Sequence, residues 1–211
     1  MVSVVTSKAV RRAPAATTTP HARIVAGARK HFFAHGFRGV TMDELARELG
    51  MSKKTLYVSF PGKLDLLRAV IADKAADIGA DLERITVEKD ADFQDKLARL
   101  LQCFHKHLGE IQPAFVRDVR REVPEVFQSI EGVRRGLLQR HFGRLLEQGR
   151  KTGLVRKDIP VQLMIEVLLG AVNSVVNPEK VEALGITPKA AMLTVINVFL
   201  EGVLTRKAIG R

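Results

Sequence analysis

Residues 41–60 read TMDELARELGMSKKTLYVSF, a sequence that predicts two short helices separated by a sharp turn. Thr41 and Glu44 have the spacing of a capping box, in which the hydroxyl accepts a hydrogen bond from the third helical N–H and the carboxylate reaches back. Gly50 stands where the first helix must end, because glycine adopts the left-handed conformation without a steric cost. Ser52 can then cap a second helix at once. Two helices joined in this way indicate a helix-turn-helix.

The second helix of this motif carries residue types that read DNA. Lys53, Lys54 and Thr55 lie in its first turn, where a lysine reaches guanine O6 or N7 and a threonine touches a thymine methyl or a phosphate. The Tyr57 hydroxyl suits a backbone phosphate. Taken singly, each lysine is better explained as a solvated surface charge, so the assignment depends on the whole motif. We expect DNA contacts from Thr41, Lys53, Lys54, Thr55, Tyr57 and Lys63.

The charge of the chain favours the same partner. There are 34 basic and 23 acidic residues among 211, a net charge of +11. Residues 1–80 hold 13 basic and 6 acidic residues, so most of the excess lies on the side of the helix-turn-helix. A basic face attracts phosphate, although a general habit of arginine use explains part of the excess.

Cysteine usage and hydropathy indicate the compartment. The single cysteine, Cys103, excludes an internal disulfide and suits a reducing cytosol. Uncharged apolar runs stay below about 18 residues, so a transmembrane helix is not expected. We therefore expect a cytoplasmic protein that associates with the nucleoid through DNA and has no contact with a membrane.

The sequence around the motif resembles the TetR-type (tetracycline-repressor-like) transcriptional regulators. Two positions depart from that pattern: His31 replaces an aliphatic residue, and Val58-Ser59 replaces an aromatic or histidine pair, which alters the preferred bases. The resemblance implies that the predicted contacts bind DNA, that residues 72–153 hold a cavity for a small-molecule effector, and that repression is the default action. The matching residues are Arg23-Ile24-Val25, Phe32, Gly36-Phe37, Thr41-Met42-Asp43-Glu44-Leu45-Ala46, Gly50, Ser52-Lys53, Thr55-Leu56-Tyr57, Phe60 and Lys63-Leu66-Leu67.

The rest of the chain predicts helices and sets the domain limits. Residues 1–20 are basic, free of acidic side chains and without a helical period, which favours a disordered arm over a transit peptide. We expect an all-α fold with a three-helix helix-turn-helix head (21–66) and a C-terminal helical ligand-binding and dimerisation domain (67–211). Helical spacing with proline and glycine punctuation places the helices at about 20–34, 63–85, 91–111, 114–122, 124–152, 160–176 and 188–208.

The last two of these helices predict the oligomeric state. VQLMIEVLLGAVNSVV (161–176) and AAMLTVINVFLEGVL (190–204) are apolar nearly all round, whereas a surface helix needs only one apolar stripe. A second copy of the same pair would cover them in a four-helix bundle with two-fold symmetry. We expect a homodimer formed through 160–176 and 188–208; an ordinary interior helix pair is the alternative.

A ligand pocket is less specified by the sequence. Phenylalanine at helical spacing also forms plain core, and Arg117 either meets an anionic ligand or lies on a solvated face. His31 and His35 have the spacing of half a metal site, but no cysteine or second histidine pair completes it, so we expect neither a metal nor a cofactor. The candidate ligand-binding residues are Phe104, His107, Phe115, Arg117, Phe127 and Phe142.

These observations favour a regulator over an enzyme. The sequence contains no Gly-rich phosphate loop, Ser/His/Asp order, metal set or paired-carboxylate pocket. One head reads only a few base pairs, so two heads on a dimer are expected to read a palindromic operator in double-stranded DNA. We predict a sequence-specific repressor released by a small molecule. The alternatives are a ligand-responsive activator and a non-specific architectural DNA binder, which would show salt dependence without sequence preference.

Overall fold

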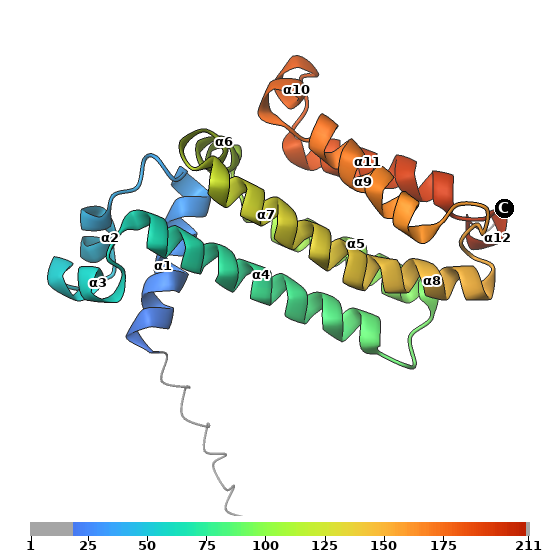
Figure 1. The fold of residues 1–211 in the computed structure, drawn as a ribbon, viewed down its shortest axis with the longest axis horizontal. Coiled ribbons are helices and arrows are strands. Elements are labelled where there is room, and N and C mark those ends of the chain that lie inside the picture. The colour runs from blue at the N-terminus through green and yellow to red at the C-terminus, as the bar shows by residue number, and fades with distance from the viewer. Residues whose placement is uncertain (1–18, 210–211) are drawn as a thin grey trace, which may run out of the picture.

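The computed structural model describes residues 19–209, and this part of the chain is built from helices (Figure 1). The predicted all-α class is therefore confirmed. The helices are α1 (Pro20–His35), α2 (Met42–Glu48), α3 (Lys53–Ser59), α4 (Lys63–Val87), α5 (Phe93–Gly109), α6 (Pro113–Glu122), α7 (Pro124–Leu137), the π-helical turn η1 (Leu138–Phe142), α8 (Gly143–Thr152), α9 (Val161–Val175), α10 (Pro178–Ala183), α11 (Pro188–Val203) and α12 (Arg206–Ile209).

The head is formed by α1, α2 and α3 with the first turns of α4. Helix α1 begins at Pro20, and the Thr19 Oγ1 atom caps it by accepting from the Ala22 N–H at 3.2 Å. Residues 1–18 of the predicted basic arm lie outside the described residues. The buried residues of the head cluster come from α1 to α4 and also from α6 and α7, among them Phe32, Leu45, Leu56, Leu66, Phe115 and Val119.

Helix α4 connects the head to the rest of the molecule. Its 25 residues span about 37 Å at 1.5 Å per residue. Leu66, Leu67 and Val70 of its first half are buried in the head cluster, whereas Leu82 and Ile85 of its second half are buried in the C-terminal cluster. A displacement of one end of this helix therefore moves residues of both cores.

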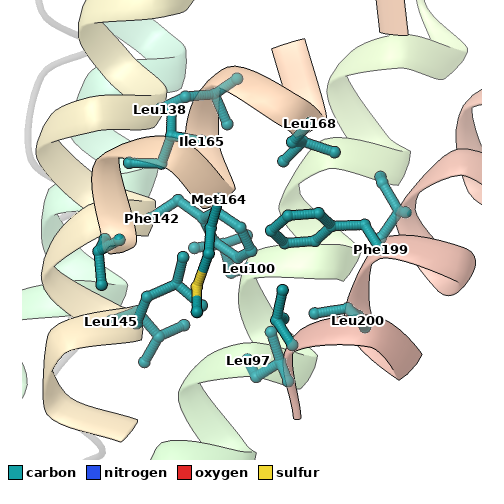
Figure 2. Packing of buried hydrophobic residues seen from close by; sticks show 14 of the residues in the cluster. Leu97, Leu100, Leu138, Phe142, Leu145, Met164, Ile165, Leu168, Phe199 and Leu200 are labelled. Carbon is teal, nitrogen blue, oxygen red and sulfur yellow. The ribbon is translucent and has the colours of Figure 1, made fainter. Parts of the chain in front are cut away.

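The C-terminal core lies among α5, α8, α9 and α11. Figure 2 shows its centre, where Phe142 and Phe199 approach each other with ring centroids 5.8 Å apart beside Leu100 and Met164. Helices α9 and α11 lie side by side on the outside of α5, α7 and α8 (Figure 1). One face of this pair is thus buried in the body and the other faces away from it.

The structure differs from the sequence-based expectation at three places in the C-terminal half. The long helix predicted at 124–152 contains the π-helical turn η1. The last helix ends at Val203 instead of 208, because Leu204 is extended and pairs with Val155 in an isolated antiparallel bridge. The short α10 was not predicted; the Asn177 Oδ1 atom caps it by accepting from the Lys180 N–H at 2.8 Å.

Within residues 19–209, no helix combines the length and the apolar character that crossing a bilayer requires.

Candidate nucleic-acid interface and its connection to the body

The capping box predicted at the start of α2 is present. The Thr41 Oγ1 atom accepts from the Glu44 N–H at 3.2 Å, and the Glu44 Oε2 atom accepts from the Thr41 N–H at 2.9 Å. The same carboxylate oxygen lies 2.8 Å from Thr41 Oγ1, so the hydroxyl donates its proton to Glu44. The hydrogen bonds from the Thr41 hydroxyl and N–H hold the pKa of the Glu44 carboxyl below its ordinary value. A phosphate contact by the Thr41 hydroxyl would replace this bond.

The turn between α2 and α3 has the predicted geometry. Gly50 has φ +62°, in the left-handed region, and the Met51 N–H donates to the Ala46 carbonyl at 2.9 Å. The Ser52 Oγ atom then caps α3 by accepting from the Thr55 N–H at 3.1 Å. The Thr55 and Ser52 hydroxyls also bond to each other at 2.8 Å. These bonds fix the direction in which the first turn of α3 points.

The face that α3 presents to solvent follows from its buried residue, Leu56, which has no exposed surface. At 100° per residue, Lys54 and Val58 lie opposite Leu56, while Thr55 and Tyr57 lie on the two flanks. All four side chains are exposed, and Val58 is 78% exposed. In the sequence, Val58 stands out only as a departure from a family pattern, whereas its angular distance from Leu56 is the signal that places it at the centre of this face. We call Lys54, Thr55, Tyr57 and Val58 the reading face.

Lys53 lies beside the reading face instead of within it. Its Nζ atom is 2.5 Å from the Asp43 Oδ2 atom of α2, and both side chains are exposed. An exposed pair of this kind is worth only about 0–1 kcal/mol, so a phosphate can replace the aspartate as partner. Lys53 is therefore suited to the DNA backbone and poorly placed for base edges.

Lys63, at the start of α4, is half-buried against the loop after α1. Its Nζ atom lies 4.3 Å from the centroid of the Phe37 ring and donates to the Arg38 carbonyl at 3.4 Å. Burial lowers the pKa of the Lys63 ammonium, against the attraction of Asp118, Glu122 and Glu44. The side chain thus supports the α1–α2 loop, and its predicted phosphate contact stays a prediction.

The six candidate ligand-binding residues are divided among several parts of the fold, and none of them lines either of the two hollows described below. Phe104 and Phe142 belong to the C-terminal core, Phe115 is buried against Phe33 with ring centroids 4.9 Å apart, and His107 is buried between α4 and α5. Phe127 is half-buried beneath Arg120, and Arg117 is exposed next to Asp118. A role in ligand binding stays a prediction for each of them.

Two hollows lie beside α4. The first, about 490 Å³ between α4 and α5, is lined by Asp81, Arg84, Ile85, Arg99, Gln102, Cys103 and Lys106. The second, about 310 Å³ between α4 and α7, is lined by Arg68, Ile71, Ala72, Ala75, Glu125, Val126, Ser129 and Val133. The first is lined mostly by polar and charged side chains, and the second mostly by small and apolar ones.

A group of metal-ligand types borders the first hollow. Within residues 19–209, Asp81, Cys103 and His107 bring ligand atoms within 4.8 Å of one another. Their partners do not suit a cation: the Lys106 Nζ atom lies 2.9 Å from Asp81 Oδ2, and the Lys74 Nζ atom lies 2.9 Å from His107 Nδ1. A metal ion here would face two ammonium groups, so Asp81 and His107 are arranged for hydrogen bonding with lysines and not for binding a metal.

Comparison with known proteins identifies the head. Residues 24–70 match the family model described as bacterial regulatory proteins, tetR family. The helix-turn-helix head of the chain belongs to this family. The chain is 24% identical over 147 residues to the fatty acid metabolism regulator protein of Bacillus subtilis, covering 67% of this chain and 74% of that protein. It is 34% identical over 64 residues to the regulator SrpR of Pseudomonas putida, covering 30% of each chain.

Solved structures with the same fold align with most of this chain. The fatty acid degradation regulator FadR of Bacillus halodurans superposes with a TM-score of 0.66 at 20% identity, covering 89% of this chain and 98% of that one. SmeT, the repressor of a multidrug efflux pump in Stenotrophomonas maltophilia, gives 0.63 at 17% identity, covering 90% and 92%. A complex of SmeT with triclosan gives 0.62 at 16% identity, covering 88% and 91%. These likenesses show the fold, and the family match makes the chain a DNA-binding transcriptional regulator. The curated relatives are regulators, not enzymes.

Proposed function

We propose that this regulator is a homodimeric repressor that reads a palindromic operator through α3 and is released by a small molecule. The observation that carries the proposal is the reading face of Lys54, Thr55, Tyr57 and Val58, which lies opposite the buried Leu56. Lysine at the N-terminal end of a recognition helix reaches guanine, and an exposed valine offers methyl groups to a thymine methyl. Thr41, Lys53 and Lys63 then bind phosphates around this face.

The outer face of α9 and α11 supports a dimer. Leu163 and Val167 on α9 are 52% and 57% exposed, and Val198 on α11 is 67% exposed. Gly170 lies three residues after Val167 on α9, and in the described part of the chain no atom comes within 4 Å of where its Cβ would lie, which leaves room for a close helix approach. This apolar face lies within the predicted interface of 160–176 and 188–208. Helix α11 ends at Val203, so the residues after it are not part of the paired helices. Two-fold pairing through it would carry two reading faces toward successive major grooves.

Contacts between α6 and the head support control by a ligand. The Gln112 N–H donates to the Phe33 carbonyl at 3.0 Å, and the Arg38 N–H donates to the Asp118 Oδ2 atom at 3.0 Å. A ligand that shifts α4 or α6 would therefore tilt the head and change the distance between the two reading faces. Such a ligand would favour a spacing that does not fit the operator.

The first experiment is a selection of genomic DNA fragments on the purified full-length protein at about 150 mM salt, which screens non-specific attraction. We expect a palindromic motif whose half-sites are separated by about one helical turn. Binding that disappears with salt and shows no preferred sequence would instead support the architectural alternative. Transcription in vitro from a promoter with the recovered site distinguishes repression from activation.

A Lys54→Ala variant tests whether α3 reads the motif. We expect it to lose the preference for the selected fragment while its helical content stays unchanged. Lys89→Ala is the matched control, because Lys89 is an exposed lysine beyond the far end of α4. Equal loss of binding in both variants would show that the charge, not the reading face, determines the affinity.

A further inference from the structure

Helix α4 carries a buried lysine in the middle of its length. Lys74 is 4% exposed, and its Nζ atom lies 2.9 Å from His107 Nδ1 and 2.6 Å from Glu110 Oε2, both on α5. Burial lowers the pKa of the Lys74 ammonium, and the hydrogen bond to Glu110 acts in the opposite direction. Burying an ammonium opposes folding unless it is paired, and an apolar side chain of similar size fills such a position at least as well. The position of Lys74 therefore points to a role beyond packing.

In one direction the contacts of Lys74 lead to the head. The Glu110 Oε2 atom also accepts from the Arg29 Nη2 atom at 2.9 Å, and Arg29 lies on α1. Its other terminal nitrogen pairs with Asp73 at 3.0 Å and with Asp77. Burial opposes the charge of Arg29, but the three acidic partners outweigh it and raise the guanidinium pKa. Lys74 and Arg29 thus share one carboxylate between the body and the head.

In the other direction the contacts lead to the hollow between α4 and α5. The His107 Nε2 atom lies 3.0 Å from the Asp81 Oδ2 atom. Burial, followed by the neighbouring Lys74 charge, lowers the His107 pKa. Because the Lys74 ammonium can only donate, His107 accepts at Nδ1 from Lys74 and donates from Nε2 to Asp81. Asp81 also accepts from Lys106 at 2.9 Å and from Arg84 at 2.5 Å.

The lining of this hollow is positively charged. Arg84, Arg99 and Lys106 face it together with a single carboxylate, that of Asp81. Arg99 has carboxylate partners beside the hollow, Glu88 at 2.6 Å and Asp95 at 3.3 Å. Arg84 and Lys106 share the Asp81 carboxylate, so within residues 19–209 this pair of cations has one salt-bridge partner between them. The remaining lining, Gln102 with Ile85 and Cys103, adds one amide and a small apolar wall. These groups favour a small ligand that carries a negatively charged oxygen group.

We propose that the hollow between α4 and α5 is an effector site for a small oxyanion, a carboxylate or a phosphate, and that the contacts Asp81–His107–Lys74–Glu110–Arg29 transmit its occupancy to α1. This inference rests on the proposed function, because it assigns the ligand class and the route of control of the same regulator. The five side chains, which we call the relay, connect the hollow to the DNA-binding head without a break.

The relay changes state through one proton. An anion that binds Arg84 and Lys106 draws them from Asp81, and the carboxylate then stabilises an imidazolium at His107, which takes one proton from solvent. The imidazolium no longer accepts from Lys74 and repels its ammonium across 2.9 Å. Lys74 then moves away from His107, and this changes how the Glu110 carboxylate divides its hydrogen bonds between Lys74 and Arg29. The charged groups that act on this histidine are Lys74 and Asp81 from α4 and Lys106 from α5, and the Cys103 thiol of α5 lies beside it. Glu110 and Arg29 follow along the relay, and Asp77 pairs with Arg29.

The experiment measures anion binding and its effect on DNA binding separately. Sodium pyrophosphate and sodium citrate are titrated into the full-length protein by calorimetry at constant ionic strength, with sodium chloride as the salt control. The affinity for the selected DNA fragment is then measured with and without each anion. We expect saturable binding of at least one anion and a change in DNA affinity of about fivefold or more. A response to pyrophosphate alone indicates a phosphate ligand, and one to citrate alone a carboxylate.

Three variants separate the site from the relay. Arg84→Gln with Lys106→Gln is expected to abolish anion binding. His107→Gln keeps one hydrogen-bond donor and one acceptor but forms no imidazolium, so it should bind the anion and lose the change in DNA affinity. His105→Gln is the matched control, because His105 is an exposed histidine on the same helix. It should behave as the unmodified protein does.

Each result has one meaning. If neither anion binds, or if the double variant binds as well as the unmodified protein, the effector site is refuted. If His107→Gln keeps the full anion effect on DNA, the relay is refuted. If the protein selects no DNA sequence when no anion is present, the proposed function fails, and the calorimetry still decides whether the hollow binds an oxyanion.

Discussion

The Asp118 carboxylate lies under the loop between α1 and α2 and accepts a hydrogen bond from the Arg38 N–H at 3.0 Å. Asp118 belongs to α6, so this bond joins the body to the head across 80 residues of sequence. The close approach is possible because residue 36 is glycine: a Cβ on Gly36 would lie 2.5 Å from Asp118 Oδ2. Gly36 also has φ +84°, a conformation that other residues rarely adopt. The joint between head and body thus depends on both residues.

Replacing Gly36 by alanine should weaken this joint. We expect Gly36→Ala to destabilise the protein by about 2 kcal/mol, because it forces an unfavourable backbone conformation and pushes the added methyl into Asp118. For a chain of this size that corresponds to a fall in Tm of about 4–8 °C. Thermal unfolding followed by circular dichroism measures it.

The control for this prediction is Gly132→Ala in α7. Gly132 has an ordinary helical conformation, and among residues 19–209 no atom lies within 4 Å of where its Cβ would be. Alanine there should leave the Tm unchanged or raise it slightly. Equal Tm values for the unmodified protein and Gly36→Ala would show that the α1–α2 loop adjusts without cost.

The head was predictable because its signals are local. The Thr41–Glu44 capping box, the left-handed Gly50 and the Ser52 cap each involve residues within a few positions of one another. Short-range rules of this kind fix the helix ends whatever the rest of the chain does. The reading face was harder to predict, because only the helical angle between Val58 and the buried Leu56 places Val58 on it.

The body was less predictable because its decisive contacts are distant in sequence. Nothing near Val203 ends α11; the helix stops because Leu204 pairs with Val155, about fifty residues earlier. The sequence around Lys74 does not reveal its burial, because its partners His107 and Glu110 are more than thirty positions away. His107 is among the candidate ligand-binding residues of the sequence, but its place between Lys74 and Asp81 required the structure.

Val58 should contribute to base preference, not to general DNA affinity. We expect Val58→Ala to lower affinity for the selected site by about fivefold, corresponding to roughly 1 kcal/mol of lost methyl contact. The loss should be confined to sites with thymine at one position of each half-site. Competition binding with single-base variants of the selected fragment measures it.

The salt dependence serves as the control for Val58→Ala. Valine carries no charge, so the slope of log affinity against log salt concentration should match that of the unmodified protein, whereas Lys53→Ala should reduce it by about one. A uniform loss across all base variants would place Val58 outside the recognition surface.

An acidic residue in the outer face of α9 should prevent dimer formation. Val167 is 57% exposed there, and a Val167→Glu carboxylate buried between two copies would have no partner and would meet its symmetry mate. We expect a monomer in sedimentation velocity and loss of binding to the palindrome. Val87→Glu is the matched control, because Val87 is 55% exposed at the end of α4. A dimer that persists in Val167→Glu would move the interface to another surface.

His141 should make stability depend on pH. It is 2% exposed in η1, and burial lowers its pKa below the ordinary value of 6.5, with Arg144 and Arg140 acting in the same direction and Glu83 opposing them. Below pH 6.5 the unfolded chain binds the proton that the folded His141 resists, so the free energy of unfolding falls as the pH drops. We expect the Tm of the unmodified protein to decrease between pH 7.5 and 5.5 more steeply than that of His141→Gln. His105→Gln, which changes an exposed histidine, should keep the steeper dependence, and parallel curves for all three proteins would assign the pH effect to other groups.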